Sequence, residues 1–235
     1  MAIVRAGALL ACAAAVTLCG CMTSHSPDAP KGVSLAGSWK LNHAASDDPQ
    51  KVLAKMREQA TRIIKRQQAE IAARTGTAPP DATGDGPPPE GGSPPPVSPG
   101  QGAAHRGDPL RRSPMAAIIR AMLERGDYLT IRQSPGEFVL DYGTFHRSFT
   151  PGGHSVVSAE GGVGDQNSGW NHKSYVITVR AQNGPEVTDS YSLSDDGQQL
   201  LETLAIGSAE LPAEKIRRVY DRTTETAPRQ TPTTD

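Results

Sequence analysis

The spacing of apolar residues after Asp127 constrains the fold of this chain more than any other feature. Apolar and polar residues alternate there in short runs, beginning with Leu129-Thr130-Ile131-Arg132, and a period of two is typical of half-buried strands. Turn sequences such as Ser134-Pro135-Gly136-Glu137 and Asn183-Gly184 separate the runs. The pattern predicts about eight or nine short strands in an antiparallel meander, a sheet that hides its edges best by closing into a small barrel.

The few aromatic residues indicate where the core of this barrel lies. The 235-residue chain has two Trp, five Tyr and three Phe; Trp39 stands apart, and the others run from Tyr128 to Tyr220. Because aromatic side chains supply much of the volume of a core, we expect the core to combine the strand around Trp39 with the strands after residue 127. The residues expected to line the interior, around a ligand cavity or in a packed core, are Leu129, Phe138, Leu140, Tyr175 and Ile177.

Two helices are predicted between the strand around Trp39 and the later strands. Apolar residues three and four apart predict helices over residues 47–74 and 114–125, with Ser46 and Ser113 as their N-caps. Basic side chains lie mostly off the apolar stripe of the first helix, so this helix either packs on its own domain or lies on a membrane surface. The stripe consists of Leu53, Met56, Ala60, Ile63, Ile64, Gln67 and Ile71.

The segment between the two helices, residues 76–112, is the least apolar part of the chain. Pro and Gly dominate Pro79–Gly100, so this stretch cannot bury enough surface to offset the entropy of ordering. We expect a disordered loop that acts either as a spacer or as a Pro-rich ligand for a partner. The polar tail, residues 223–235, is also expected to be unstructured.

The N-terminal residues indicate export and a lipid attachment site. An apolar run too short to span a bilayer follows Arg5, and it ends in Leu18-Cys19-Gly20-Cys21, which matches the cleavage pattern of bacterial lipoproteins. We expect residues 1–20 to be a signal peptide, Cys21 to carry the lipid, and residues 21–32 to form a flexible tether. Met22, in place of an Asp, favours delivery to the outer membrane, facing the periplasm.

Composition excludes several classes of function. The Cys residues lie at positions 12, 19 and 21, so cleavage and lipidation would leave no thiol for a disulfide, a metal site or a nucleophile. The chain carries 24 basic and 25 acidic residues, and this balance offers no excess positive charge for nucleic-acid binding. We expect no nucleic-acid partner and no cofactor.

Gly37-Ser38-Trp39, at the start of the first predicted strand, resembles the Gly-x-Trp motif of the lipocalins and other calycins. The resemblance implies a small antiparallel barrel in which Trp39 closes one end. It also implies that an Arg of the last strand lies over the Trp39 ring, here Arg217 or Arg218. The chain departs from the lipocalins in its helical, Pro-rich insertion after the first strand and in its lack of their disulfide.

Residues 36–222 are also similar to a group of uncharacterised secreted proteins of Gram-negative bacteria. The similarity lies in GSWKLN followed by SDDP, a Pro- and Gly-rich insertion, a YLTI strand and a final RRVYDR. It implies a lipocalin-like β domain over residues 33–222 and a place in the cell envelope. It implies no activity, because a shared fold does not carry a function with it.

Two groups of residues have some features of catalytic or phosphate-binding sites. Gly161-Gly162-Val163-Gly164-Asp165 lacks the helix and the Lys of a phosphate-binding loop, and we interpret it as a flexible hairpin loop. Glu202 with Glu210 or Asp189 could form a pair of carboxylates, but acidic residues on strands are usually solvated. We therefore predict no catalytic residues.

Three histidines, His146, His154 and His172, lie on or near predicted strands. Zinc sites need three or four ligands that converge on the ion, and these histidines lack the paired spacing of such sites. We interpret them as surface residues and predict no metal site; Asp165 would be the fourth ligand if one existed.

These features together predict a lipid-anchored envelope protein that is not an enzyme. In the first hypothesis it binds a small apolar ligand or an envelope component in the mouth of the barrel. In the alternative it is an interaction or structural protein of the periplasm that acts through the first helix and the Pro-rich loop. An open cavity favours the first hypothesis, and an interior filled by its own side chains favours the second.

Overall fold

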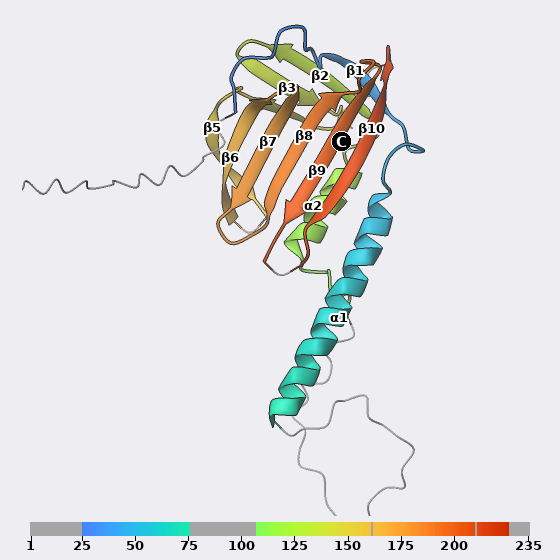
Figure 1. Cartoon of the computed structure of the whole chain (residues 1–235), viewed down its shortest axis with the longest axis vertical. Coiled ribbons are helices and arrows are strands. Elements are labelled where there is room, and N and C mark those ends of the chain that lie inside the picture. The colour runs from blue at the N-terminus through green and yellow to red at the C-terminus, as the bar shows by residue number, and fades with distance from the viewer. Residues whose placement is uncertain (1–24, 76–106, 161, 210, 226–235) are drawn as a thin grey trace, which may run out of the picture.

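The computed structural model describes residues 25–75, 107–160, 162–209 and 211–225. The predicted signal peptide, Cys21, most of the Pro-rich loop and nearly all of the C-terminal tail lie outside these ranges. The described residues form a mainly β domain with two helices between its first and second strands (Figure 1). The predicted fold class is confirmed.

Ten strands form one antiparallel sheet in the described residues, in the order β4-β3-β2-β1-β10-β9-β8-β7-β6-β5. Strands that follow each other in the chain are neighbours, except that β1 pairs with β10 and that β4 and β5 are the two edges. The sheet curls around its inner face into a half-barrel (Figure 1), which we call the barrel. The predicted closure is incomplete, because the edge strands β4 and β5 do not pair with each other. Its strands are β1 (Gly37–Leu41), β2 (Tyr128–Ser134), β3 (Glu137–Asp141), β4 (His146–Phe149), β5 (His154–Ala159), β6 (Gly162–Asn171), β7 (Ser174–Ala181), β8 (Glu186–Leu193), β9 (Gln199–Gly207) and β10 (Glu214–Thr223).

Strand β6 occupies most of the segment that was predicted to be a flexible loop. It pairs along both edges, so that Gly164 lies opposite Val157 of β5 and Ala181 of β7. A Cβ atom at Gly164 would lie 3.2 Å from the Arg180 carbonyl oxygen, which shows how closely the backbones approach. The loop prediction was wrong because pairing on both sides outweighs the low strand propensity of glycine.

The free edge of β6 beyond β5 is covered by the N-terminal segment. Ser26 exchanges two backbone hydrogen bonds of 2.8 Å with Trp170 of β6. A Cβ atom at Gly169 would lie 2.8 Å from the Ser26 carbonyl oxygen, so this contact requires glycine. We call residues 25–28 the N-terminal strap. The prediction of a flexible tether over residues 21–32 was wrong at Ser26, because backbone pairing holds this residue on the barrel.

The two helices are α1 (Pro49–Thr75) and α2 (Pro114–Leu123). Ser113 caps α2 as predicted, because its hydroxyl accepts a hydrogen bond from the Ala116 amide. The predicted cap of α1 was wrong. The Ser46 hydroxyl instead accepts from the Val219 amide of β10, and the Asp48 carboxylate accepts from the Gln50 amide in the first turn of α1.

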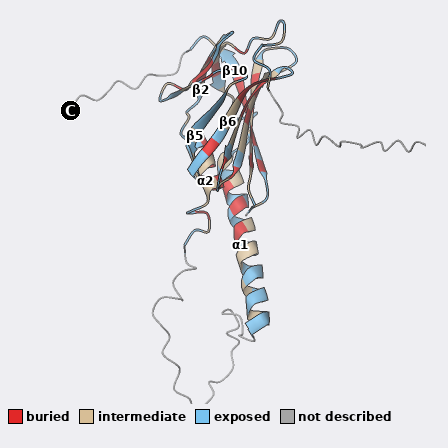
Figure 2. Cartoon of the chain, turned by 90° about the vertical axis from the view of Figure 1, so that its left-hand side faces the viewer, coloured by how far each residue is buried: buried red, intermediate tan, exposed pale blue. Residues whose placement is uncertain are grey.

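The helices cover one end of the curled sheet with a separate apolar cluster. Leu53, Met56 and Ala60 of α1 are buried there, and the fully buried Leu110 joins them from the segment that leads into α2. The side chains that complete this cluster come from α2 and the ends of β9 and β10; they are Met115, Ala116, Ile119, Met122, Leu204, Ile206 and Ile216. The second half of α1 extends beyond the barrel and is mostly exposed (Figure 2). None of the described helices is long and apolar enough to cross a membrane.

Candidate functional site

The five residues that were predicted to line the interior meet in one packed cluster. Leu129, Phe138, Leu140, Tyr175 and Ile177 are each at most 2% exposed. The Phe138 ring of β3 stacks on the Tyr175 ring of β7, with 3.7 Å between centroids and 13° between planes. Strands from opposite walls therefore contact each other directly, and a ligand would have to part these rings to reach the middle of the barrel.

Trp39 is fully buried, and a guanidinium lies over its ring, but the residue is Arg222 rather than Arg217 or Arg218. The Arg222 Cζ atom is 4.3 Å from the Trp39 ring centroid. The correction follows from register, because Trp39 pairs with Arg222 across β1 and β10. Gly37 makes room for this contact, since a Cβ atom there would lie 2.8 Å from the Arg222 Nη1 atom.

Arg217 and Arg218 point to opposite faces of β10, as neighbours on a strand do. Arg217 is exposed, and its backbone amide donates to the Asp47 carboxylate at 2.8 Å. Arg218 is only 5% exposed and faces inward. Its Nη2 atom donates to the Gly126 carbonyl oxygen at 3.0 Å, and its Cζ atom lies 5.2 Å from the Tyr220 ring centroid.

A cluster of buried charges lies inside the barrel behind Arg218. Glu202 of β9 is fully buried and Asp189 of β8 is 4% exposed, so their interpretation as solvated residues was wrong. The Arg125 Nη1 atom, just after α2, is 2.7 Å from Glu202 and 3.1 Å from Asp189. Arg218 adds a longer ion pair of 3.7 Å with Glu202. Two guanidinium groups thus balance two carboxylates that water does not reach.

Tyrosine hydroxyls complete this buried cluster. Tyr220 donates to Glu202 at 2.7 Å, and Tyr191 donates to Asp189 at 2.9 Å. Burial and the neighbouring Glu202 carboxylate raise the pKa of Asp189 to about 6. Burial also raises the pKa of the Tyr191 hydroxyl, so this group stays a hydrogen-bond donor at neutral pH. Two atoms of the cluster have no hydrogen-bond partner among the described residues: Asp189 Oδ1 and Arg218 Nη1.

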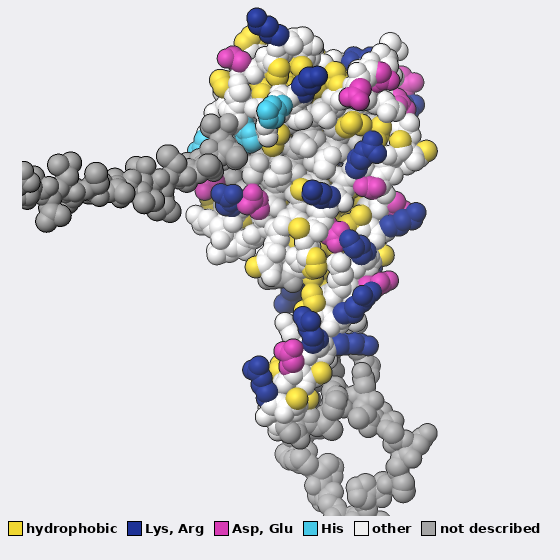
Figure 3. All heavy atoms as spheres, in the orientation of Figure 1, with side chains coloured by type: hydrophobic (Ala, Val, Ile, Leu, Met, Phe, Trp, Pro, Cys, Tyr) yellow, Lys and Arg dark blue, Asp and Glu magenta, His cyan; other side chains and the backbone are white. Residues whose placement is uncertain are grey.

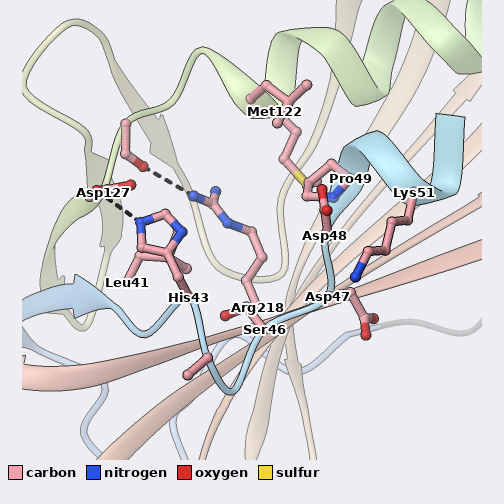
Figure 4. A pocket seen from close by; sticks show the side chains of 13 residues that line it. Leu41, His43, Ser46, Asp47, Asp48, Pro49, Lys51, Met122, Asp127 and Arg218 are labelled. Carbon is pink, nitrogen blue, oxygen red and sulfur yellow. Dashed lines mark hydrogen bonds and ion pairs between the residues drawn. The ribbon is translucent and has the colours of Figure 1, made fainter. Parts of the chain in front are cut away.

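A cavity of about 660 Å³ opens over Arg218 at the helix-covered end of the barrel (Figure 4). Its walls come from the β1–α1 connection, the end of α2, strand β10 and the turn that precedes β2. They combine aliphatic side chains with charged ones. The lining residues are Leu41, His43, Ala44, Ser46, Asp47, Asp48, Pro49, Lys51, Met122, Leu123, Gly126, Asp127 and Arg218. We call this cavity the mouth pocket.

The carboxylates of the mouth pocket are already engaged with other groups. Asp127 lies 3.0 Å from the His43 ring nitrogen. Asp47 accepts from the Arg217 amide, and Asp48 accepts from the Gln50 amide. The Arg218 guanidinium, by contrast, has one nitrogen without a hydrogen-bond acceptor in the described part of the chain. The pocket therefore joins an apolar wall to an incompletely paired cation.

The histidines that were weighed as metal ligands lie apart from this pocket. His154 is exposed and lies 3.5 Å from Asp165 on the neighbouring strand. His146 lies on the edge strand β4, and His172 lies in the β6–β7 turn with a φ angle of 52°. Within the described ranges, no three His, Cys, Asp or Glu side chains are grouped so that they could hold a metal ion.

Neither a protein-family model nor a curated protein matches this sequence. Among solved structures, the chain is similar to apo lipid binding protein 8 from Caenorhabditis elegans, with 13% identity, a TM-score of 0.44, and coverage of 82% of this chain and 99% of that one. It is similar to the fatty acid transporter REP1-NXSQ, with 11% identity, a TM-score of 0.41, and coverage of 81% and 97%.

A third similar structure is the fatty-acid-binding protein of Manduca sexta, with 16% identity, a TM-score of 0.33, and coverage of 44% of this chain and 78% of that one. These neighbours are binding and transport proteins by name. At these scores the fold assignment of the present chain rests on its own strand order and pairing. Membership of a Gram-negative lipoprotein family stays a prediction.

Proposed function

We propose that this chain is a non-enzymatic binding protein of the cell envelope that takes a small apolar molecule with one acidic group in the mouth pocket. The observation that carries the proposal is Arg218, which lines the pocket and is 5% exposed. Its Nη1 atom makes no hydrogen bond within the described residues, and Glu202 is its ion partner at 3.7 Å. A buried guanidinium without its full set of acceptors favours a carboxylate or similar anion, because charge-assisted hydrogen bonds to Arg are strong and directional.

The rest of the ligand would lie against the aliphatic wall of the pocket. Leu41, Met122 and Leu123 line it, and its volume of about 660 Å³ is in the range of small-molecule sites. Because the barrel interior behind Arg218 is packed, we place the ligand at this end of the domain and not at its centre. The filled interior is the outcome that favours the interaction-protein alternative for the centre of the barrel. The ligand hypothesis drawn from the sequence is therefore kept only for the mouth pocket.

A fluorescent aromatic anion, anilinonaphthalene sulfonate, tests the pocket directly. We expect it to bind a chain that begins at Met22, and we expect laurate, but not the uncharged dodecanol, to displace it. Leu123 is 38% exposed at the rim, so Leu123→Trp should fill the pocket without disturbing the core. This variant should bind the probe at least about tenfold more weakly, a difference of about 1.4 kcal/mol.

The matched control is Val163→Trp, which makes a similar change at an exposed residue of β6 away from the pocket. It should bind the probe as the unchanged chain does. If the Leu123→Trp variant and the unchanged chain bind the probe with equal affinity, the probe does not bind in the mouth pocket, and the proposed site is wrong. If dodecanol displaces the probe as strongly as laurate does, the pocket does not require an acidic group in its ligand.

Anchoring through Cys21 and a place at the outer membrane are also part of the proposal. Ser26 is bound to the barrel five residues after Cys21, and five residues span at most about 18 Å. A lipid on Cys21 would therefore hold the strap side of the barrel close to the membrane. Native mass spectrometry of the protein extracted from its host should show acyl chains on Cys21; an unmodified N-terminus would contradict the anchor.

A further inference from the structure

The apolar stripe of α1 continues past the point where the barrel stops covering it. Leu53, Met56 and Ala60 are buried against α2 and the sheet. Farther along the same stripe, Ile64 is only partly buried and Ile71 is 61% exposed. Figure 2 shows this change from buried to exposed residues along the helix. We call residues 61–75 the distal half of α1.

The distal half also concentrates positive charge. It contains Arg62, Lys65, Arg66 and Arg74 against a single carboxylate, Glu70, whereas the whole chain has a formal charge of −1. The exposed side chain of Arg62 pairs with Glu58 one turn earlier, and the other three cations have no ion pair within the described residues. Figure 3 shows Lys and Arg side chains gathered along α1 below the barrel.

Three of the four cations lie away from the isoleucines around the helix, whereas Arg74, three residues after Ile71, lies beside it. At 3.6 residues per turn, Ile64 and Ile71 fall on one side, and Arg62, Lys65 and Arg66 fall mainly on the other. An apolar stripe opposite a basic face is typical of helices that lie in the surface of a membrane. The helix is also not apolar enough to cross one.

We propose that the distal half of α1 docks on an anionic phospholipid surface. The isoleucines would enter the boundary between headgroups and acyl chains, and the cations would lie against lipid phosphates. A protein groove would account for the apolar stripe alone, whereas an anionic bilayer accounts for both the stripe and the charge. The inference goes beyond the mouth pocket and depends on neither that pocket nor a lipid at Cys21.

Co-sedimentation with lipid vesicles tests this proposal. A chain that begins at Met22 keeps every described residue and lacks the predicted lipid attachment site. We expect it to bind vesicles that contain phosphatidylglycerol and to leave vesicles of pure phosphatidylcholine unbound. Binding should weaken with salt, because raising the ionic strength from about 0.1 to about 1 M shortens the Debye length from about 10 to about 3 Å.

Two helix variants separate the contributions of charge and stripe. Removing two cations with Lys65→Gln and Arg66→Gln should weaken partitioning about 25-fold, at about fivefold for each cation near the surface. Ile71→Gln should weaken vesicle binding about tenfold, because the variant no longer has an apolar side chain at this position to bury in the bilayer. Far-ultraviolet circular dichroism should show that both variants keep the helix.

The matched control removes two cations from the barrel instead, with Arg132→Gln and Arg180→Gln. Both side chains are exposed, at 61% and 70%, and we expect this variant to bind vesicles nearly as well as the unchanged chain. The proposal is overturned if phosphatidylglycerol vesicles do not retain the chain. It is equally overturned if the barrel variant loses as much binding as the helix variant.

Discussion

At the residue scale, the barrel interior accommodates charge because each charged group has a partner of opposite sign. Glu202 is fully buried between Arg125, Arg218 and Tyr220. A single unpaired carboxylate in that position would be very costly, whereas a balanced, hydrogen-bonded set is tolerated. The cluster places Arg218 at the floor of the mouth pocket and positions it for the ligand that we propose.

Asp189 should give the fold a pH-dependent stability. Its pKa is about 6 in the folded chain, raised from 3.8 by burial and by Glu202. Between these two values the folded state binds more protons than the unfolded state, so the free energy of unfolding falls as the pH rises from about 4 to about 6.

Urea unfolding at a series of pH values should reveal this slope, and Asp189→Asn should remove it. The exposed Asp165 on β6 offers a control, since Asp165→Asn should leave the slope in place. If the Asp189→Asn variant keeps the same dependence between about pH 4 and about pH 6, another group must be responsible.

At the element scale, α1 is one helix with two different roles along a single stripe. Met56 is fully buried in the cluster under the barrel, and Ile71 is mostly exposed. Met56→Ala should therefore lower the free energy of unfolding by about 2–5 kcal/mol, and Ile71→Ala should change it by no more than about 0.5 kcal/mol. Chemical denaturation of the two variants checks both values. A large cost for Ile71→Ala would mean that the distal half is packed on the barrel.

At the scale of the whole molecule, the N-terminal strap completes the edge of the sheet beside β6. A chain that begins at Ala29 instead of Met22 lacks the strap. It therefore loses the two hydrogen bonds between Ser26 and Trp170, each of which contributes about 1 kcal/mol. We expect the Trp170 amide to exchange its hydrogen at least about tenfold faster, as hydrogen-exchange mass spectrometry would show. Peptides from β9 should exchange as before, and an unchanged rate at Trp170 would mean that the strap does not protect the edge.

Local patterns in the sequence were enough to predict much of this architecture. The two-residue period after Asp127 predicts the meander, and the three- and four-residue spacing predicts α1 and α2 nearly to their observed ends. Ser113 was also identified as a cap, because its hydroxyl bonds to an amide only three residues away. Such features depend on neighbours in the chain, so the sequence alone determined them.

The tertiary structure decided the features that depend on distant strands. Register between β1 and β10 placed Arg222, not Arg217 or Arg218, over Trp39. Pairing on both edges made a strand of the glycine-rich segment. The mouth pocket and the buried charges form where the end of α2 meets β1, β8, β9 and β10. No local spacing records which side chains will lie together there. The sequence determined the helices and most of the strands, whereas packing determined β6 and the candidate site.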